Sequence, residues 1–147
     1  RNDIVGAKVA RDDKQLYFYV ETADKLTSPQ DRNWMMLFID TDRNKATGWN
    51  GYDIIVNRVN PRGNQAVVER NVGNRWEWEE TAAVPFSVDG NKLTFGVDKH
   101  VLGLGAGAVD IEFKWNDNMQ ENGNIMDFYV NGDAAPGGRF NFVYSAK

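Results

Sequence analysis

The sequence predicts an all-β protein, an antiparallel β-sandwich of the immunoglobulin or jelly-roll type with about ten strands. Many short segments keep a hydrophobic period of two, which a helix would not keep. Turn signals separate these segments, and the clearest is the Asp-Gly pair at residues 89–90, which lies between two alternating segments. We expect at most one short helical turn, at residues 99–102. Closure of the strands into a barrel is an alternative that the pattern leaves open.

The first part of the chain predicts three strands. We expect the first at residues 4–10 and the second at residues 16–22, where apolar residues alternate with polar or aromatic ones. A loop at residues 26–33 follows. Residues 34–39 are six consecutive apolar residues, a run that is too short for a helix and is bounded by polar residues. This run predicts a strand that is buried on both faces.

The rest of the chain continues the pattern of short strands and turns. Later strands are expected at residues 52–56, 66–71, 75–79, 84–88, 93–97, 109–115, 126–130 and 139–144. Asp98 would cap the helical turn, and the glycines that follow would end it. Trp34 and Trp115 lie in apolar or alternating segments, so we expect both in the core. Trp76 and Trp78 share a face and are expected to be buried as well.

The composition limits the classes of function. The chain of 147 residues is long enough for one domain, residues 1–147, with its own core. The net charge of −4 comes from interspersed acids and bases, which argues against nucleic acid, and no apolar segment is long enough to span a membrane. The chain begins abruptly at Arg1, which predicts that the domain was excised from a larger protein. Without cysteines and with His100 as the only histidine, thiolate and multi-histidine metal sites are excluded.

The most distinctive feature is an acidic loop that follows the buried run. Asp40, Asp42 and Asn44 place side-chain oxygens at alternate positions, and Gly48 and Gly51 follow them. Loops that bind hard cations present oxygens in this way, so we expect Ca²⁺ here in a structural role. The alternative is that these side chains form Asx turns and cap the loop by bonding their own backbone.

The same loop carries the best candidate for sugar binding. Trp49 lies between small or polar residues at the tip of the loop, where we expect its ring to be exposed. An exposed aromatic ring can stack on the apolar face of a sugar, while polar neighbours bind its hydroxyl groups. Asn50, Tyr52 and Arg58 are the expected hydrogen-bonding neighbours.

Catalysis is not expected. The carboxylate pairs that could act in glycoside hydrolysis are Glu79 with Glu80, Asp12 with Asp13, and Asp117 with Glu121. Nothing in the sequence places any of these pairs across a cleft, and acids at turns are normally solvated. His100 lies among apolar residues, which predicts a packing residue rather than a catalytic base.

Four blocks of sequence carry a resemblance to a known family. They are LYFYVET at residues 16–22, LFIDTDRNKATGWNGYDIIVNR at residues 37–58, FKWNDN at residues 113–118, and GRFNFVY at residues 138–144. In this order they resemble family-9 carbohydrate-binding modules and the wider group of related sandwich domains.

The resemblance implies a non-catalytic β-sandwich that binds a polysaccharide or oligosaccharide and holds structural calcium. Such a domain would be an accessory part of a secreted, cell-surface or periplasmic polysaccharide-processing protein, and other domains of that protein would be its partners. Asp40, Asp42 and Asn44 match a characteristic loop of the family. The stacking tryptophans of sugar-binding members have no counterpart at residues 28–32 or 132–138, which contain no aromatic residue.

Three functions therefore compete. The leading hypothesis is a carbohydrate-binding domain. The second is a structural or protein-docking domain that kept the fold and lost the sugar site, which a large exposed apolar patch would favour. The third is a hydrolase or lyase, which needs two carboxylates, or an acid and a histidine, that converge in a cleft.

Overall fold

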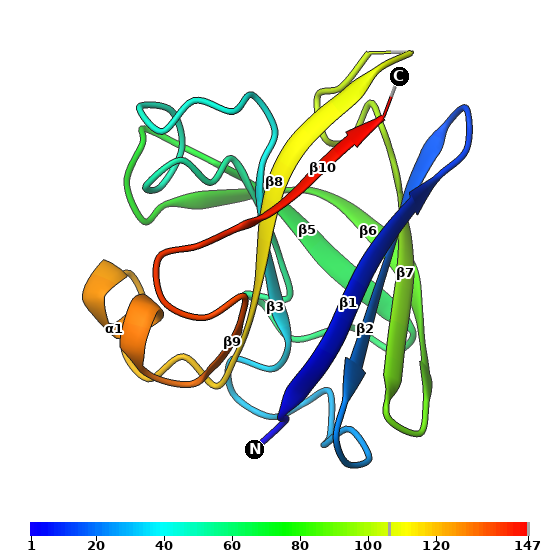
Figure 1. The fold of residues 1–147 in the computed structure, drawn as a ribbon, viewed down its shortest axis with the longest axis vertical. Coiled ribbons are helices and arrows are strands. Elements are labelled where there is room, and N and C mark those ends of the chain that lie inside the picture. Colours follow the sequence, from blue (N-terminus) through cyan, green and yellow to red (C-terminus); the bar gives the residue numbers. More distant parts are fainter. Residues whose placement is uncertain (106, 147) are drawn as a thin grey trace.

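The computed structural model describes residues 1–105 and 107–146, and in this part the chain is almost entirely antiparallel β-structure (Figure 1). The elements are β1 (Ile4–Arg11), β2 (Gln15–Thr22), β3 (Met36–Asp40), β4 (Ile54–Val56), β5 (Gln65–Asn71), β6 (Trp78–Asp89), β7 (Lys92–Asp98), β8 (Val109–Asp117), α1 (Ile125–Val130), β9 (Asp133–Ala135) and β10 (Phe142–Ala146). The predicted all-β class is confirmed.

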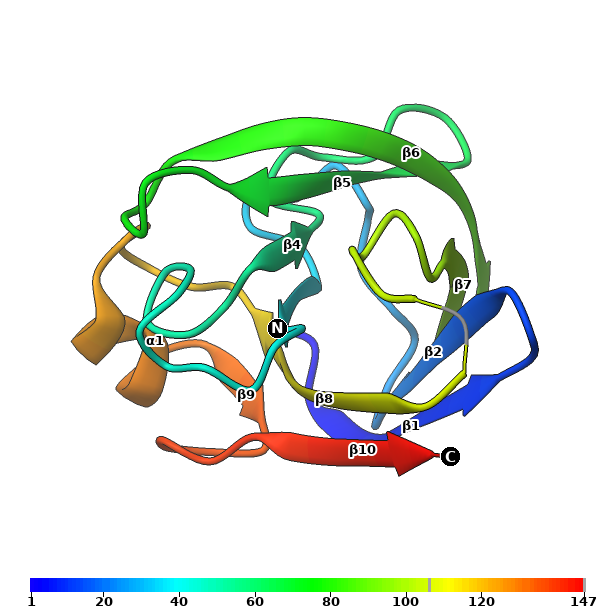
Figure 2. The same cartoon turned by 90° about the horizontal axis from the view of Figure 1, so that it is seen from above.

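The strands form one hydrogen-bonded path, in the order β1-β2-β7-β6-β5-β4-β3-β8-β10, with β9 beside β8. This path curls into a nearly closed, barrel-like sheet (Figure 2). The curvature depends on β6, which is the longest strand. Residues from Trp78 to Pro85 pair with β5, and residues from Phe86 to Asp89 pair with β7. The sequence predicts two strands at 75–79 and 84–88, but residues 78–79 and 84–88 belong to the single strand β6, and residues 75–77 lie outside any strand.

Strand β3 is buried on both faces, as its apolar run predicts. Leu37 and Ile39 face the main core, which also contains Trp34 and Trp115 as expected. The opposite face of β3 packs into a second cluster, which we call the aromatic cluster. Its buried members are Met36, Phe38, Trp49, Tyr52, Ile55, Met119 and Phe128. Trp76 and Trp78 lie half-buried against this cluster.

Residues 126–130 form the helix α1 rather than the predicted strand. The Asn124 side chain caps this helix by accepting hydrogen bonds from the backbone N–H groups of Met126 and Asp127. Phe128 is buried, whereas Met126 and Val130 are exposed. The alternation of apolar residues misled the prediction, because a helix of one and a half turns is too short to show its own period.

Two other expectations about local structure also fail. Residues 99–102 form successive turns instead of a helix, with hydrogen bonds from Val101 N–H to Asp98 C=O (3.0 Å) and from Leu102 N–H to Lys99 C=O (3.1 Å). The glycines at 103 and 105 have low helix propensity and disfavour a longer helix. The last strand begins at Phe142 rather than at residue 139, and the short strand β9 precedes it.

Candidate functional site

The loop between β3 and β4 brings three carboxylates together. Asp40, Asp42 and Asp53 each present an oxygen, and these oxygens all lie within 4.8 Å of one another. The register of the strands explains this proximity, since Ile39 pairs with Ile54 and so places Asp40 beside Asp53. The loop folds back tightly between them.

Asp40 is the buried member of this carboxylate cluster. Its side chain is 0% exposed, and burial is the main reason that its pKa is raised. Oδ2 lies 3.1 Å from Lys45 Nζ, but in the described part of the chain Oδ1 has no hydrogen-bond partner. A buried carboxylate oxygen without a partner is costly, and its position beside two further carboxylates makes it a natural ligand for a cation.

Asp53 and Asp42 complete the cluster. Burial raises the pKa of Asp53 to about 6, although Oδ2 accepts hydrogen bonds from the Thr41 backbone N–H (2.9 Å) and hydroxyl (3.1 Å). Burial also opposes ionisation of Asp42, but hydrogen bonds from the Thr47 hydroxyl and the Asn44 N–H lower its pKa overall. Three carboxylates so close together oppose one another's ionisation, which a divalent cation would relieve. The donor set, all hard oxygens, fits Ca²⁺.

Asn44 has a local role in the structure. Its Oδ1 accepts a hydrogen bond from the Ala46 N–H (2.9 Å), and its own N–H donates to Asp42 Oδ1 (3.0 Å). These are the Asx turns that the sequence left open as an alternative. The third carboxylate of the cluster comes instead from Asp53, which the sequence analysis missed. The pairing of β3 with β4, rather than the spacing within the loop, brings Asp53 to this site.

The expectation that Trp49 is exposed is wrong. Its side chain is 4% exposed and lies inside the aromatic cluster, with ring centroids 4.7 Å from Trp76 and 5.4 Å from Phe128. Tyr52 is buried in the same cluster, and its hydroxyl donates to Asn141 Oδ1. The face of β3 that points away from the main core carries Met36 and Phe38. The loop covers this face with the rings of Trp49 and Tyr52.

The other two residues predicted to bind sugar beside Trp49, Asn50 and Arg58, have different surroundings. Asn50 is exposed at the loop tip, with a φ of 50°. Arg58 forms a two-pronged ion pair with Glu69, with Nε at 2.8 Å and Nη2 at 2.7 Å from the two carboxylate oxygens. This pair links the segment after β4 to β5 and occupies the guanidinium group of Arg58.

Two groups considered for catalysis have other surroundings. Asp117 is fully buried and binds Arg1 Nη2 (2.9 Å) and the backbone N–H groups of Asn2 and Met35 (both 3.0 Å). It therefore fixes the N-terminal residues to β8. His100 is exposed beside a small hollow of ≈ 280 Å³, so the expectation that it is a packing residue is wrong.

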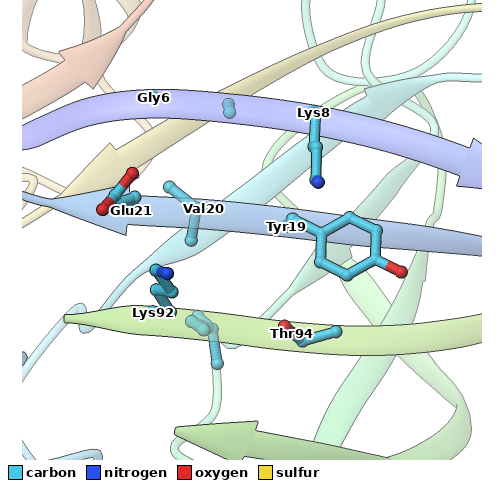
Figure 3. A pocket seen from close by; sticks show the side chains of 9 residues that line it. Gly6, Lys8, Tyr19, Val20, Glu21, Lys92 and Thr94 are labelled. Carbon is cyan, nitrogen blue, oxygen red and sulfur yellow. The ribbon is translucent and has the colours of Figure 1, made fainter. Parts of the chain in front are cut away.

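A larger hollow of ≈ 390 Å³ lies on the outer face of β1, β2 and β7, and we call it the outer-face hollow (Figure 3). Its lining includes the side chains of Lys8, Tyr19, Glu21, Lys92 and Thr94. Gly6 leaves a gap in β1, since a Cβ atom on it would meet nothing within 4 Å. The alternation of β2 points Tyr19 and Glu21 outward, while Phe18 and Val20 enter the core.

In the sequence, this alternation predicts a strand but no binding site. The signal that could have indicated a site is a pair of tyrosines on the outward face of β2, at Tyr17 and Tyr19, opposite a neighbouring strand that contains a glycine. In Figure 3 the Tyr19 ring is seen face-on between Lys8 on β1 and Thr94 on β7, and Glu21 and Lys92 lie together farther along the strands. Lys8 Nζ is 4.9 Å from the centre of the Tyr19 ring.

Comparison with known proteins gives no assignment. No protein-family model, curated protein or solved structure matches the chain. Among the helices of the described residues, none has the length and apolar character that crossing a membrane requires.

Proposed function

We propose that this chain is a non-catalytic carbohydrate-binding domain, a β-sandwich like the family-9 modules that its sequence resembles. It would serve as an accessory domain of a secreted, cell-surface or periplasmic protein that processes polysaccharides. The observation that carries this proposal is the outer-face hollow, in which an aromatic ring lies between polar side chains on a rigid sheet.

The chemistry of this hollow suits a sugar. A pyranose ring has an apolar face of C–H groups, which packs on an aromatic ring, and a rim of hydroxyl groups, which need directed hydrogen bonds. Tyr19 supplies the ring, while Thr94, Glu21 and Lys92 supply donors and acceptors around it. Because these residues project from hydrogen-bonded strands rather than from a loop, little ordering would be required on binding.

A Ca²⁺ ion would belong to the carboxylate cluster and would have a structural role. Asp40, Asp42 and Asp53 would hold it, and it would neutralise their mutual repulsion and brace the loop at residues 40–53. Figures 1 and 2 place this loop on the opposite side of the molecule from β1 and β2. The ion would therefore stabilise the domain without contacting a sugar in the outer-face hollow.

Binding of oligosaccharides to the isolated chain tests the proposal. A panel of neutral and acidic oligosaccharides should include ligands that bind by calorimetry and shift the NMR signals of β1, β2 and β7. Tyr19→Ala should weaken this binding by about ten-fold, while Trp76→Phe, on the other side of the molecule, should retain it. If no carbohydrate binds, in calcium or in chelator, the proposal is wrong.

A second candidate function, docking onto another protein, has an observation of its own. Three apolar side chains around α1 and the segment before β10 are strongly exposed: Met126 (53%), Val130 (71%) and Phe140 (76%). Arg139 joins these two segments, since its guanidinium lies 5.3 Å from the Tyr129 ring centre and 4.0 Å from Met126 Sδ. Association with another domain of the parent protein that is lost in Phe140→Ser, but kept in Tyr19→Ala, would favour this function.

A further inference from the structure

The outer-face hollow carries more cationic than anionic side chains. Lys8 and Lys92 line it with a single carboxylate, that of Glu21. Within the residues that the structure describes, neither lysine forms an ion pair or a hydrogen bond through its ammonium group, and that of Lys8 lies over the Tyr19 ring. The whole chain has a net charge of −4, so this excess of positive charge is local.

The two lysines differ in their surroundings. Lys92 is the cross-strand neighbour of Glu21, and Figure 3 shows the two side chains at the same end of the hollow. Lys8 is the cross-strand neighbour of Tyr19, and the residue on the far side of that ring is the neutral Thr94. The cation next to the aromatic ring is thus the one with no carboxylate beside it.

We infer that the outer-face hollow recognises a uronic acid residue of an acidic glycan. This inference rests on the proposed carbohydrate-binding function and names its substrate class. The pyranose ring of the uronate would pack on Tyr19, and its carboxylate would pair with the ammonium group of Lys8. Glu21 and Thr94 would bind sugar hydroxyl groups, and the carboxylate of Glu21 would disfavour a second negative charge at the Lys92 end.

A pair of ligands that differ only in charge tests this inference. Hexagalacturonate and its fully methyl-esterified form have the same sugar rings, but only the first carries carboxylates. Calorimetry should show tighter binding of the acid, by up to about five-fold for one exposed ion pair. The difference should shrink as salt is raised, because both partners of the pair are exposed to solvent.

Substitutions assign the preference to a residue. Lys8→Gln should bring binding of the acid down to that of the ester, since the substitution removes the ammonium group that would pair with the carboxylate. Lys14→Gln is the matched control, because Lys14 is an exposed lysine in the turn after β1 and lies outside this hollow. Tyr19→Ala should weaken binding of both ligands by about ten-fold. Thermal melting of each variant would check that the fold is retained.

The outcomes separate this inference from the function on which it rests. If the acid and the ester bind equally well, the uronate inference is wrong and the carbohydrate-binding function stands. If neither these ligands nor neutral oligosaccharides bind, both are wrong. If the acid is preferred but Lys8→Gln keeps the preference, the assignment to this hollow is wrong.

Discussion

Calcium should raise the thermal stability of this domain through the carboxylate cluster. An ion that binds the folded chain and not the unfolded one adds about 2.7 kcal/mol when its concentration is a hundred times its dissociation constant. For 147 residues the entropy of unfolding is about 0.3 kcal/mol/K, so the expected increase in Tm is about 9 °C. Part of the binding energy must displace Lys45 from Asp40, but the Lys45 side chain is 55% exposed and can move into solvent easily.

Differential scanning calorimetry in excess calcium and in chelator measures this increase. Asp40→Asn should lose most of it, because the substitution replaces the buried carboxylate whose Oδ1 lacks a partner. Asp24→Asn, at an exposed acid outside the cluster, should keep the full increase. Equal increases in the wild type and in Asp40→Asn, or no increase in millimolar calcium, would refute the reasoning.

Three further predictions concern the fold. Gly48→Ala should destabilise the domain by several kcal/mol in urea unfolding, because Gly48 has a φ of 80° and a Cβ atom there would collide with the Tyr52 carbonyl. Gly63→Ala is the control. Gly63 has a φ of 60° but open space around it, so this substitution should cost only about 1 kcal/mol. Trp49→Ala should cost about 3–5 kcal/mol in the same assay, as expected of a buried ring, and a loss below 1 kcal/mol would contradict its place in the aromatic cluster. Burial lowers the pKa of Lys114 to about 8, so the unfolded chain holds this proton more tightly than the folded one. The free energy of unfolding should therefore rise between about pH 8 and pH 10.4, by up to about 3 kcal/mol. Lys114→Met should lose this rise.

The sequence predicts the strands well where one physical pattern dominates. Strand β2 alternates because one face meets the core and the other meets solvent, and β3 is continuously apolar because both faces are covered. The helix α1 is missed because its apolar residues at 126, 128 and 130 also fit an alternating strand. Only the cap at Asn124 distinguishes a helix from a strand here, and a single capping residue is a weak signal.

The candidate site is predicted in part, and the reasons lie in tertiary structure. Asp40 and Asp42 are neighbours in sequence, so their convergence can be predicted from spacing alone. Asp53 joins them through the register of β3 and β4, which no local pattern specifies. The burial of Trp49 depends on the second apolar face of β3, which needs a cover from some part of the chain. The small residues beside Trp49, such as Gly48, do not indicate whether its ring is buried.

Because β6 is long, it couples the stability of the two sides of the molecule. One end of this strand is bonded to β5, on the side of the carboxylate cluster, and the other end is bonded to β7, which borders the outer-face hollow. Melting either side would strip backbone hydrogen bonds from the same strand, so the domain should unfold in one step. An ion bound by the loop would then slow amide exchange in β7 as well, although β7 borders the distant outer-face hollow.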